Sequence, residues 1–350
     1  MKVLSLFDGI SVLRCALGDR PVQYFASEID KYAIEVSKKN YPDIKQLGDV
    51  KTVKDVSGVY LLCGGSPCQD LSIAKKDRKG LKGDRSGLFY QYLRILKESK
   101  PNFFILENVY SMPKEDRDII TTELGVEPIM IDAALVSAQS RKRLFWTNIP
   151  VKGLPTDRSI KLKDILLPES EVEDKYYTTS TTKRVEKNTK TPGAKTGVYE
   201  VMTEVKKENP AFNQIGYFGA ENACGVGGQA LRVYDTEKKS PTSGVGLFEV
   251  GVSIRAHKQG EEWVNKVEHR TDDKASALTQ SFSGKLALVG TFEKKEVKRI
   301  RRLTPVECER LQSLPDNYTR GISNTQRYRC LGNAFNCEVM RFILSFLPDQ

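Results

Sequence analysis

The fold of this chain is decided by the stretch Val59-Tyr60-Leu61-Leu62-Cys63-Gly64-Gly65-Ser66-Pro67-Cys68-Gln69-Asp70-Leu71-Ser72. Its first five residues are apolar and typical of a buried strand, and the two glycines allow a sharp turn. Pro67 then stiffens the backbone ahead of Cys68, which begins a loop. Because ligands bind at the carboxyl ends of strands in α/β proteins, an accessible Cys68 is a candidate nucleophile. The alternative is a cysteine that packs in the core, as most free cysteines do.

Strand-like and helix-like segments alternate on both sides of this stretch, through residues 1–150. We expect strands at 3–7, 22–27, 44–47, 59–63, 103–106, 129–136 and 143–147. We expect helices at 12–17, 33–41 and 88–97. This alternation predicts an α/β fold with a doubly wound, mostly parallel sheet.

Polar residues recur directly after the expected strands: Asp8, Glu28, Asp49, Cys68 and Glu107. In a parallel sheet these positions lie along one rim. A carboxylate after the second strand is well placed to accept hydrogen bonds from ribose hydroxyls, and one after the third strand could accept from an adenine amino group. Taken singly, each residue could instead be a helix cap or a turn residue.

Composition narrows the class of protein. A chain of 350 residues can form one large domain or two ordinary ones, and its net charge of +10 suits a polyanionic partner. No stretch approaches the roughly 20 apolar residues of a membrane span, and the N-terminus lacks the pattern of a signal peptide. Seven irregularly spaced cysteines indicate a reducing compartment, and two histidines without a C-x-x-C pair argue against a zinc site.

Residues 151–300 have a different character, rich in Lys, Thr, Gly and Ser, with short β-prone pieces at 231–234, 252–255 and 286–289. We interpret them as an irregular, β-containing second domain that presents basic loops. A solvated insertion is the alternative, although apolar residues recur too regularly for disorder. Order returns at Thr304, which with Pro305 and Glu307 has the pattern of a capped helix start. An apolar helix at 339–347 is expected to pack back on the first domain.

These motifs, in this order, resemble those of the cytosine-C5 DNA methyltransferases over almost the whole chain. The matching pieces are Phe7-Asp8-Gly9-Ile10-Ser11, Gly65-Ser66-Pro67-Cys68-Gln69, Glu107-Asn108-Val109, Gln139-Ser140-Arg141-Lys142-Arg143, the helix at 301–314 and Gly332-Asn333-Ala334-Phe335. Two pieces depart from the commoner pattern. Ser11-Val12 replaces a glycine pair, and Ala334-Phe335 replaces Ser-Val, as in the eukaryotic de novo and phage-type members.

The resemblance implies a Rossmann-like methyltransferase sheet with helices on both faces and a smaller, irregular target recognition domain. Residues 1–150, completed by 325–350, would form the catalytic domain that binds S-adenosylmethionine. Residues 151–324, including the helix at 301–314, would form the recognition domain. The implied activity is methyl transfer from S-adenosylmethionine to C5 of a cytosine in a specific duplex DNA sequence, with S-adenosylhomocysteine as product and no metal.

The resemblance also implies roles for single residues. Cys68 would attack C6 of the cytosine, and Glu107 would hydrogen-bond or protonate N3. Arg141 and Arg143 would contact the base and its phosphate, stabilise the developing charge and lower the pKa of the Cys68 thiol; without the other motifs they would be a surface basic pair. The residues implied in cofactor binding are Phe7, Asp8, Gly9, Ile10, Ser11, Glu28, Ile29, Asp49, Val50, Pro67, Leu88, Asn333 and Ala334.

The target carbon is inaccessible inside a duplex, so the cytosine must be flipped out. The basic segment 73–87 resembles the mobile loop that closes over such a base, though it could be a merely solvated charged loop. Candidate DNA contacts are Gln69, Ser72, Lys75, Lys76, Arg78, Gln139, Arg232 and Arg255.

Three other functions compete with this one. An RNA methyltransferase on the same fold would usually have a shorter recognition region and a Cys-Phe-Thr motif, which this sequence lacks. A catalytically inactive DNA-binding relative is disfavoured by the intact Cys68, Glu107 and Arg143. A dehydrogenase would need Gly-x-Gly-x-x-Gly after the first strand. We expect a cytoplasmic monomer from a bacterium or phage, with a companion restriction endonuclease as a possible partner.

Overall fold

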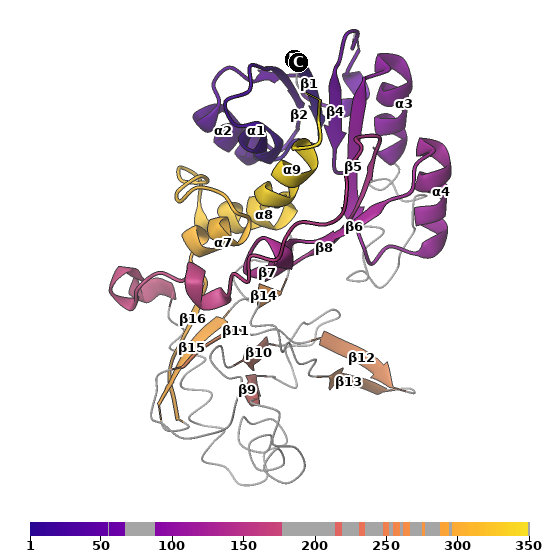
Figure 1. Cartoon of the computed structure of the whole chain (residues 1–350). Coiled ribbons are helices and arrows are strands. Elements are labelled where there is room, and N and C mark those ends of the chain that lie inside the picture. Colours follow the sequence, from indigo (N-terminus) through magenta and orange to yellow (C-terminus); the bar gives the residue numbers. More distant parts are fainter. Residues whose placement is uncertain are drawn as a thin grey trace.

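The computed structural model describes residues 1–54, 56–66, 88–176 and 302–348 in full, and within 214–301 only the backbone of strands β9 to β16 (Figure 1). Pro67, Cys68, Gln69, Ser72, Lys75, Lys76 and Arg78 lie outside the described residues, as does the predicted mobile loop at 73–87. Among the helices that are described, none has the length and apolar character needed to cross a membrane.

The first part of the chain forms a seven-stranded sheet in the order β3-β2-β1-β4-β5-β8-β6. Its strands are β1 (Lys2–Leu6), β2 (Gln23–Ser27), β3 (Lys45–Gln46), β4 (Leu61–Gly64), β5 (Phe103–Val109), β6 (Ile129–Asp132) and β8 (Lys142–Thr147). The first five strands of that order pair in parallel, and β8 runs antiparallel to both β5 and β6. The predicted doubly wound, mostly parallel sheet is confirmed.

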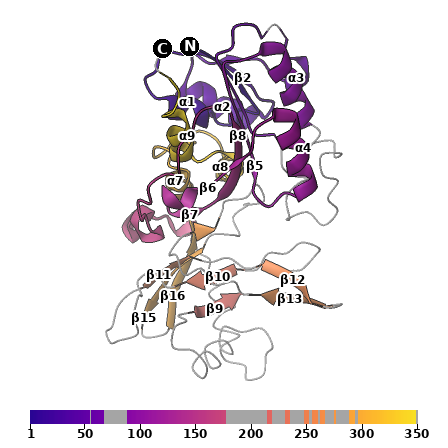
Figure 2. The ribbon, with the colours of Figure 1, turned by 45° about the vertical axis from the view of Figure 1, so that its right-hand side comes forward.

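Both faces of the sheet are covered, which is why its strands are almost continuously apolar. In β1, Val3 points to one face, whereas Leu4 and Leu6 point to the other. The first face packs against α1 (Val12–Leu17) and α2 (Lys31–Asn40). The second packs against α3 (Phe89–Ser99) and α4 (Lys114–Leu124), which Figure 2 shows on the opposite side of the sheet.

Helix α4 is not among the elements that the sequence predicts. Its segment, KEDRDIITTEL, is mostly polar, and only Ile120 and Leu124 are buried. So narrow an apolar stripe is a weak periodic signal. The helix forms because those two side chains complete the core on the second face of the sheet.

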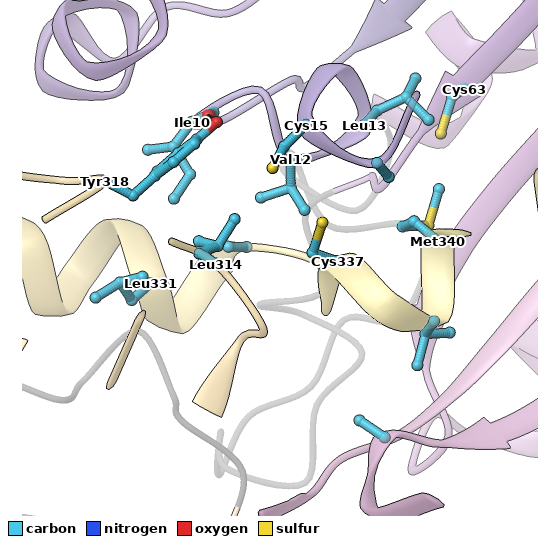
Figure 3. Close-up of a cluster of buried hydrophobic side chains, with 14 of the residues drawn as sticks. Ile10, Val12, Leu13, Cys15, Cys63, Leu314, Tyr318, Leu331, Cys337 and Met340 are labelled. Atoms are coloured by element: carbon cyan, nitrogen blue, oxygen red, sulfur yellow. Dashed lines mark hydrogen bonds between the residues drawn. The ribbon is translucent and has the colours of Figure 1, made fainter. Parts of the chain in front are cut away.

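The end of the chain returns to the first face of the sheet as α7 (Pro305–Leu311), α8 (Asn324–Asn333) and α9 (Cys337–Leu344). Figure 3 shows the side chains of α1 and α9, including Val12, Cys15, Cys337 and Met340, in one buried cluster. The expectation that the last helix packs back on the first domain is therefore met.

Helix α7 starts as predicted but packs elsewhere than expected. Thr304 Oγ1 accepts from the Glu307 amide at 3.2 Å, and Glu307 Oε2 accepts from the Thr304 amide at 2.6 Å, which completes a capping box. Cys308 and Leu311 lie in the same core as α1, α8 and α9. The predicted domain boundary at residue 324 differs from this packing, because α7 belongs with the main sheet and not with the strands of residues 214–301.

A second group of short strands lies apart from the main sheet in Figure 1. These strands are β9 (Gln214–Phe218), β10 (Leu231–Tyr234), β11 (Phe248–Gly251), β12 (Arg255–Gln259), β13 (Glu262–Lys266), β15 (Leu288–Glu293) and β16 (Glu296–Arg302). The β-prone piece predicted at 231–234 coincides with β10, and the piece at 286–289 overlaps the start of β15. The short β14 (Ala275–Ser276) pairs in parallel with β7 (Gln139–Ser140), and so joins this region to the main domain.

Candidate active site

The turn after β1 is held in an unusual conformation. Phe7, Gly9 and Ser11 all have positive φ, at 56°, 58° and 60°. Such left-handed positions are costly for residues with a Cβ unless the surroundings enforce them. Glu28, at the end of β2, provides one restraint, because its Oε2 accepts from the Gly9 amide at 2.8 Å and its Oε1 accepts from the Ile29 amide at 2.8 Å. The first two strand ends are thereby joined.

Asp8 supports the same turn from below. Its carboxylate is buried and accepts from the Tyr24 hydroxyl at 2.6 Å and from Ser11 Oγ at 2.5 Å. Burial raises the pKa of Asp8 to about 6, against the lowering effect of these hydrogen bonds. Asp8, Ile10 and Ser11 are all buried, so they form the base of the turn, whereas Phe7 and Gly9 are partly exposed at its surface.

The neighbouring strand ends present groups that suit a nucleoside. Ile29 is 73% exposed and lies beside the partly exposed Glu28. Asp49 is exposed after β3 and uses one oxygen to cap Lys51 at 2.9 Å, which leaves the other oxygen available. An apolar side chain flanked by two carboxylates can cover an aromatic ring and accept from hydroxyl and amino groups. Val50 instead lies in the core beneath this surface.

Glu107 and Arg143 form an ion pair on the adjacent antiparallel strands β5 and β8. Arg143 Nε lies 2.8 Å from Glu107 Oε1, and the two side chains are only 16% and 13% exposed. Arg143 lies opposite Val109 in the β-ladder, so its side chain meets Glu107 diagonally on the same face. The antiparallel insertion of β8 is what brings this cation to the carboxylate.

Asn108 ties the end of β5 to the turn after β4. Its Nδ2 donates to Ser66 Oγ at 3.2 Å and more weakly to the Ser66 carbonyl at 3.5 Å, while its Oδ1 accepts from the Val109 amide at 2.8 Å. Both Asn108 and Ser66 are buried. The Asn108 side chain is therefore hydrogen-bonded to a residue two positions before Cys68. By contrast Cys63 is fully buried in β4, and burial raises the pKa of its thiol, as expected for a core cysteine.

Arg141 lies inside the protein and reaches across to the C-terminal segment. Its Nη2 donates to the Ala334 carbonyl at 2.9 Å and to the Gly332 carbonyl at 3.1 Å, and the residue is 4% exposed. Gln139 is also fully buried, next to β14. These contacts of Arg141 are structural, so its contact with the base and phosphate stays a prediction, and Gln139 has no exposed surface for its predicted contact with DNA.

The predicted residues fall into two groups, and the first of them lines a hollow. Glu107, Arg141 and Arg143 converge there, with Phe335 and Asn336 from the C-terminal segment; the full lining is Glu107, Ile131, Ala133, Arg141, Arg143, Phe145, Phe335, Asn336 and Val339. Asp8, Glu28 and Asp49 lie along the β1–β3 end of the rim. Leu88 begins α3 and is partly buried, Asn333 is exposed and Ala334 is buried. The contacts of Asn108 and Phe335 are not among the predictions.

Comparison with known proteins decides the family. The model of the C-5 cytosine-specific DNA methylases matches residues 1–347. The chain belongs to this family. The methylase is 28% identical to the orphan methyltransferase M.SPRI of Bacillus phage SPR, with 99% of this chain and 97% of that protein aligned. It is 25% identical to the type II methyltransferase M.HhaI of Haemophilus parahaemolyticus, with 98% and 93% aligned.

The fold of the methylase is also found among solved structures. The Entamoeba histolytica methyltransferase EhMeth superposes with a TM-score of 0.63 over 99% of this chain and 97% of that chain, at 16% identity. At this identity the likeness concerns the fold alone. The family match identifies the protein as a DNA cytosine-C5 methyltransferase, as the order of its motifs predicts.

Proposed function

We propose that this methylase transfers a methyl group from S-adenosylmethionine to C5 of a cytosine flipped out of a specific duplex DNA sequence, through a covalent bond between Cys68 and C6. One observation carries the proposal. The Glu107–Arg143 ion pair lies beside the Gly65–Ser66 turn that leads to Cys68, in a chain that the family model spans almost completely. A carboxyl group, a guanidinium and a thiol are the three groups that activation of a cytosine ring requires.

In the first step the Cys68 thiolate forms the S–C6 bond, and the electrons of the C5–C6 double bond move toward N3. Arg143 occupies Oε1 of Glu107, which leaves Oε2 toward the turn, where it can share a proton with N3. That proton prevents full negative charge from building up on the ring. S-adenosylmethionine supplies the methyl group that C5 then takes up. Loss of the C5 proton and breakage of the S–C6 bond restore the ring and the Cys68 thiolate.

The β1–β3 end of the rim fits the nucleoside part of S-adenosylmethionine. The Glu28 carboxylate keeps lone pairs for ribose hydroxyls beyond its bonds to backbone amides, and Asp49 keeps one oxygen for the adenine amino group. The exposed Ile29 would cover the adenine ring. The positive-φ turn at Phe7 and Gly9 would lie under the methionine end, and Pro67, Leu88, Asn333 and Ala334 stay predicted contacts.

DNA binding rests on charge and on the segments outside the described residues. A net charge of +10 favours a polyanion, and phosphate neutralisation makes affinity fall steeply with salt. We propose that the loop at 73–87 closes over the flipped base and that the strands of residues 214–301 present the recognition surface, with Arg232 in β10 and Arg255 in β12. A salt-independent affinity would contradict this part of the proposal.

The proposal is tested by bisulfite sequencing of DNA from cells that express the protein, since that reports activity and target site together. The purified protein should also form a covalent adduct with duplex DNA that contains 5-fluorocytosine, and Cys68→Ala should abolish both the adduct and the methylation. A tRNA substrate in parallel separates DNA from RNA methylation. Methylation of tRNA alone, or no methylation and no adduct on varied DNA, would overturn the proposal.

We propose that the enzyme acts as a monomer on DNA in the cytoplasm of a bacterial host, and the bacterial setting is supported by its two sequence relatives, which come from a phage and a bacterium. One of those relatives is called an orphan and the other a type II enzyme. A companion restriction endonuclease is therefore a separate proposal, which cleavage of unmethylated DNA by a host lysate would support.

A further inference from the structure

Phe335 occupies a special position in the C-terminal segment that crosses the active site. It follows Ala334, whose carbonyl is held by Arg141 Nη2 at 2.9 Å, and it precedes Asn336, whose Nδ2 donates to the Leu311 carbonyl at 3.1 Å. Asn336 also caps α9 by accepting from the Val339 amide at 3.1 Å. The backbone on both sides of Phe335 is therefore anchored, so the ring extends from a rigid base.

The ring of Phe335 meets the turn that leads to Cys68. A Cβ atom added to Gly65 would lie 2.8 Å from Cε1 and 3.2 Å from Cζ of this ring. The same Cβ would lie 3.2 Å from Oε2 of Glu107. An aromatic ring, the backbone of the turn before Cys68 and Oε2 of Glu107 thus converge on one point. A side chain at position 65 would force the Phe335 ring or the turn to shift.

Phe335 differs from an ordinary core residue in what it faces. It is only partly buried, and it lines the hollow together with Glu107 and Arg143. Its neighbours Ala334 and Asn336 are buried and supply the packing that holds the segment in place. The ring belongs to the apolar part of the lining, and Glu107, Arg141 and Arg143 are its charged part.

We propose that Phe335 is a positioning residue for methyl transfer. Its ring braces Gly65 and so sets the distance between the turn that leads to Cys68 and the carboxylate of Glu107. This inference rests on the proposed function, because it concerns the geometry of that reaction. A displacement of about 1 Å in a reacting group can cost on the order of 100-fold in rate, so a brace at this point is chemically significant.

The test uses four variants of the full-length protein: Phe335→Ala, Gly65→Ala, the double variant, and Phe342→Ala as a matched control. Phe342 is another partly buried phenylalanine of the same core, in α9, and it does not line the hollow. For each variant, kcat, KM for DNA, the thermal midpoint and the rate of Cys68 alkylation by iodoacetamide are measured, the last by peptide mass spectrometry.

We expect Phe335→Ala and Gly65→Ala each to lower kcat by about 10- to 100-fold with little change in KM for DNA. Both substitutions should change the rate at which iodoacetamide alkylates Cys68, whereas Phe342→Ala should lower only the thermal midpoint. The double variant should be faster than Gly65→Ala, because the added methyl group then enters space that the ring has left. Such a rescue requires that the two positions act on each other.

Two results would overturn the inference. The first is a Phe335→Ala enzyme that matches Phe342→Ala in every measurement. The second is a double variant whose loss of kcat equals the product of the two single losses. Failure of the proposed function looks different, since the unaltered protein would then methylate no DNA in the same assay.

Discussion

The two halves of the active-site rim are built in different ways. At the β1–β3 end, Tyr24 binds Asp8 across 16 positions and Glu28 binds Gly9 across 19, and the hydroxyl of the distant Tyr318 donates to the Ile10 carbonyl at 2.8 Å. At the β4–β5–β8 end, Asn108 reaches Ser66 across 42 positions and Arg141 reaches Gly332 across 191. The carboxylates of the cofactor half are therefore oriented by residues nearby in sequence, with the C-terminal segment supporting the turn, whereas the side chains of the reacting half are held by contacts between distant segments.

Buried and accessible charged side chains of the rim have different roles. Asp8 is buried, and its carboxylate accepts the hydrogen bonds that hold the turn after β1. Glu107 and Arg143 are paired but keep about a seventh of their side-chain surface exposed to the hollow. The buried charge of Asp8 therefore supports the backbone, whereas the accessible charges of the rim, which include Glu28 and Asp49, are placed to meet a ligand. The following predictions test this division.

The largest effect is expected for Glu107→Gln, which keeps the shape of the side chain but removes the proton that N3 would share. We expect kcat to fall by about 100-fold or more, with DNA affinity nearly unchanged. Single-turnover methyl transfer and equilibrium DNA binding measure the two quantities. Glu123→Gln, at an exposed ion pair with Lys97, is the control. An equal loss of rate and of DNA binding would remove the chemical role.

The buried support at the other half predicts a pH effect on stability. Asp8 has a pKa of about 6 in the folded protein, above its ordinary value of 3.8, so folding favours its protonated form. That contribution is fully present below pH 3.8 and is lost as the pH rises through 6, which corresponds to about 3 kcal/mol in total. The unfolding free energy of Asp8→Asn should therefore rise relative to the unaltered protein between pH 4 and 7. Urea unfolding across this range measures the difference, and a constant difference would contradict it.

An intermediate effect is expected for Asn108→Ala, which removes both hydrogen bonds to Ser66. Because two neutral hydrogen bonds contribute about 1 kcal/mol each, we expect kcat to fall by up to roughly 30-fold. Ser66→Ala removes only the hydrogen bond to Oγ, so its loss should be smaller, roughly fivefold, and the double variant should be little worse than Asn108→Ala. If the losses of kcat in the two single variants add up in the double variant, the hydrogen bonds between Asn108 and Ser66 do not act on the turn before Cys68.

The smallest effect is expected for Ile29→Ala. The side chain is 73% exposed, so its truncation should leave the thermal midpoint unchanged. Loss of its contact with the adenine ring should raise KM for S-adenosylmethionine by about three- to tenfold with kcat retained, since partial burial of such a side chain contributes about 1 kcal/mol. A fall in kcat at constant KM would move Ile29 from the cofactor half to the reacting half.

Much of the main domain could be predicted from the sequence because its signals are local. The buried strands are recognisable as continuous apolar segments of the sequence. The helix at 12–17 and the capping box of Thr304 appear at the predicted residues. Helix α4 was not predictable, since its two buried side chains give almost no periodic signal. The place of α7 was not predictable either, because a capped helix start says nothing about which core the helix joins.

The stretch at 59–72 and the ordered motifs by themselves determined the fold class, the family and the rim that carries the chemistry, because parallel strands bring their carboxyl ends together. Only the tertiary structure decided how the rim is held. Arg143 meets Glu107 because β8 inserts antiparallel to β5, Arg141 binds the backbone of Gly332 and Ala334, and Phe335 packs on Gly65. Such contacts depend on the relative placement of distant segments, for which a linear motif carries no distance information.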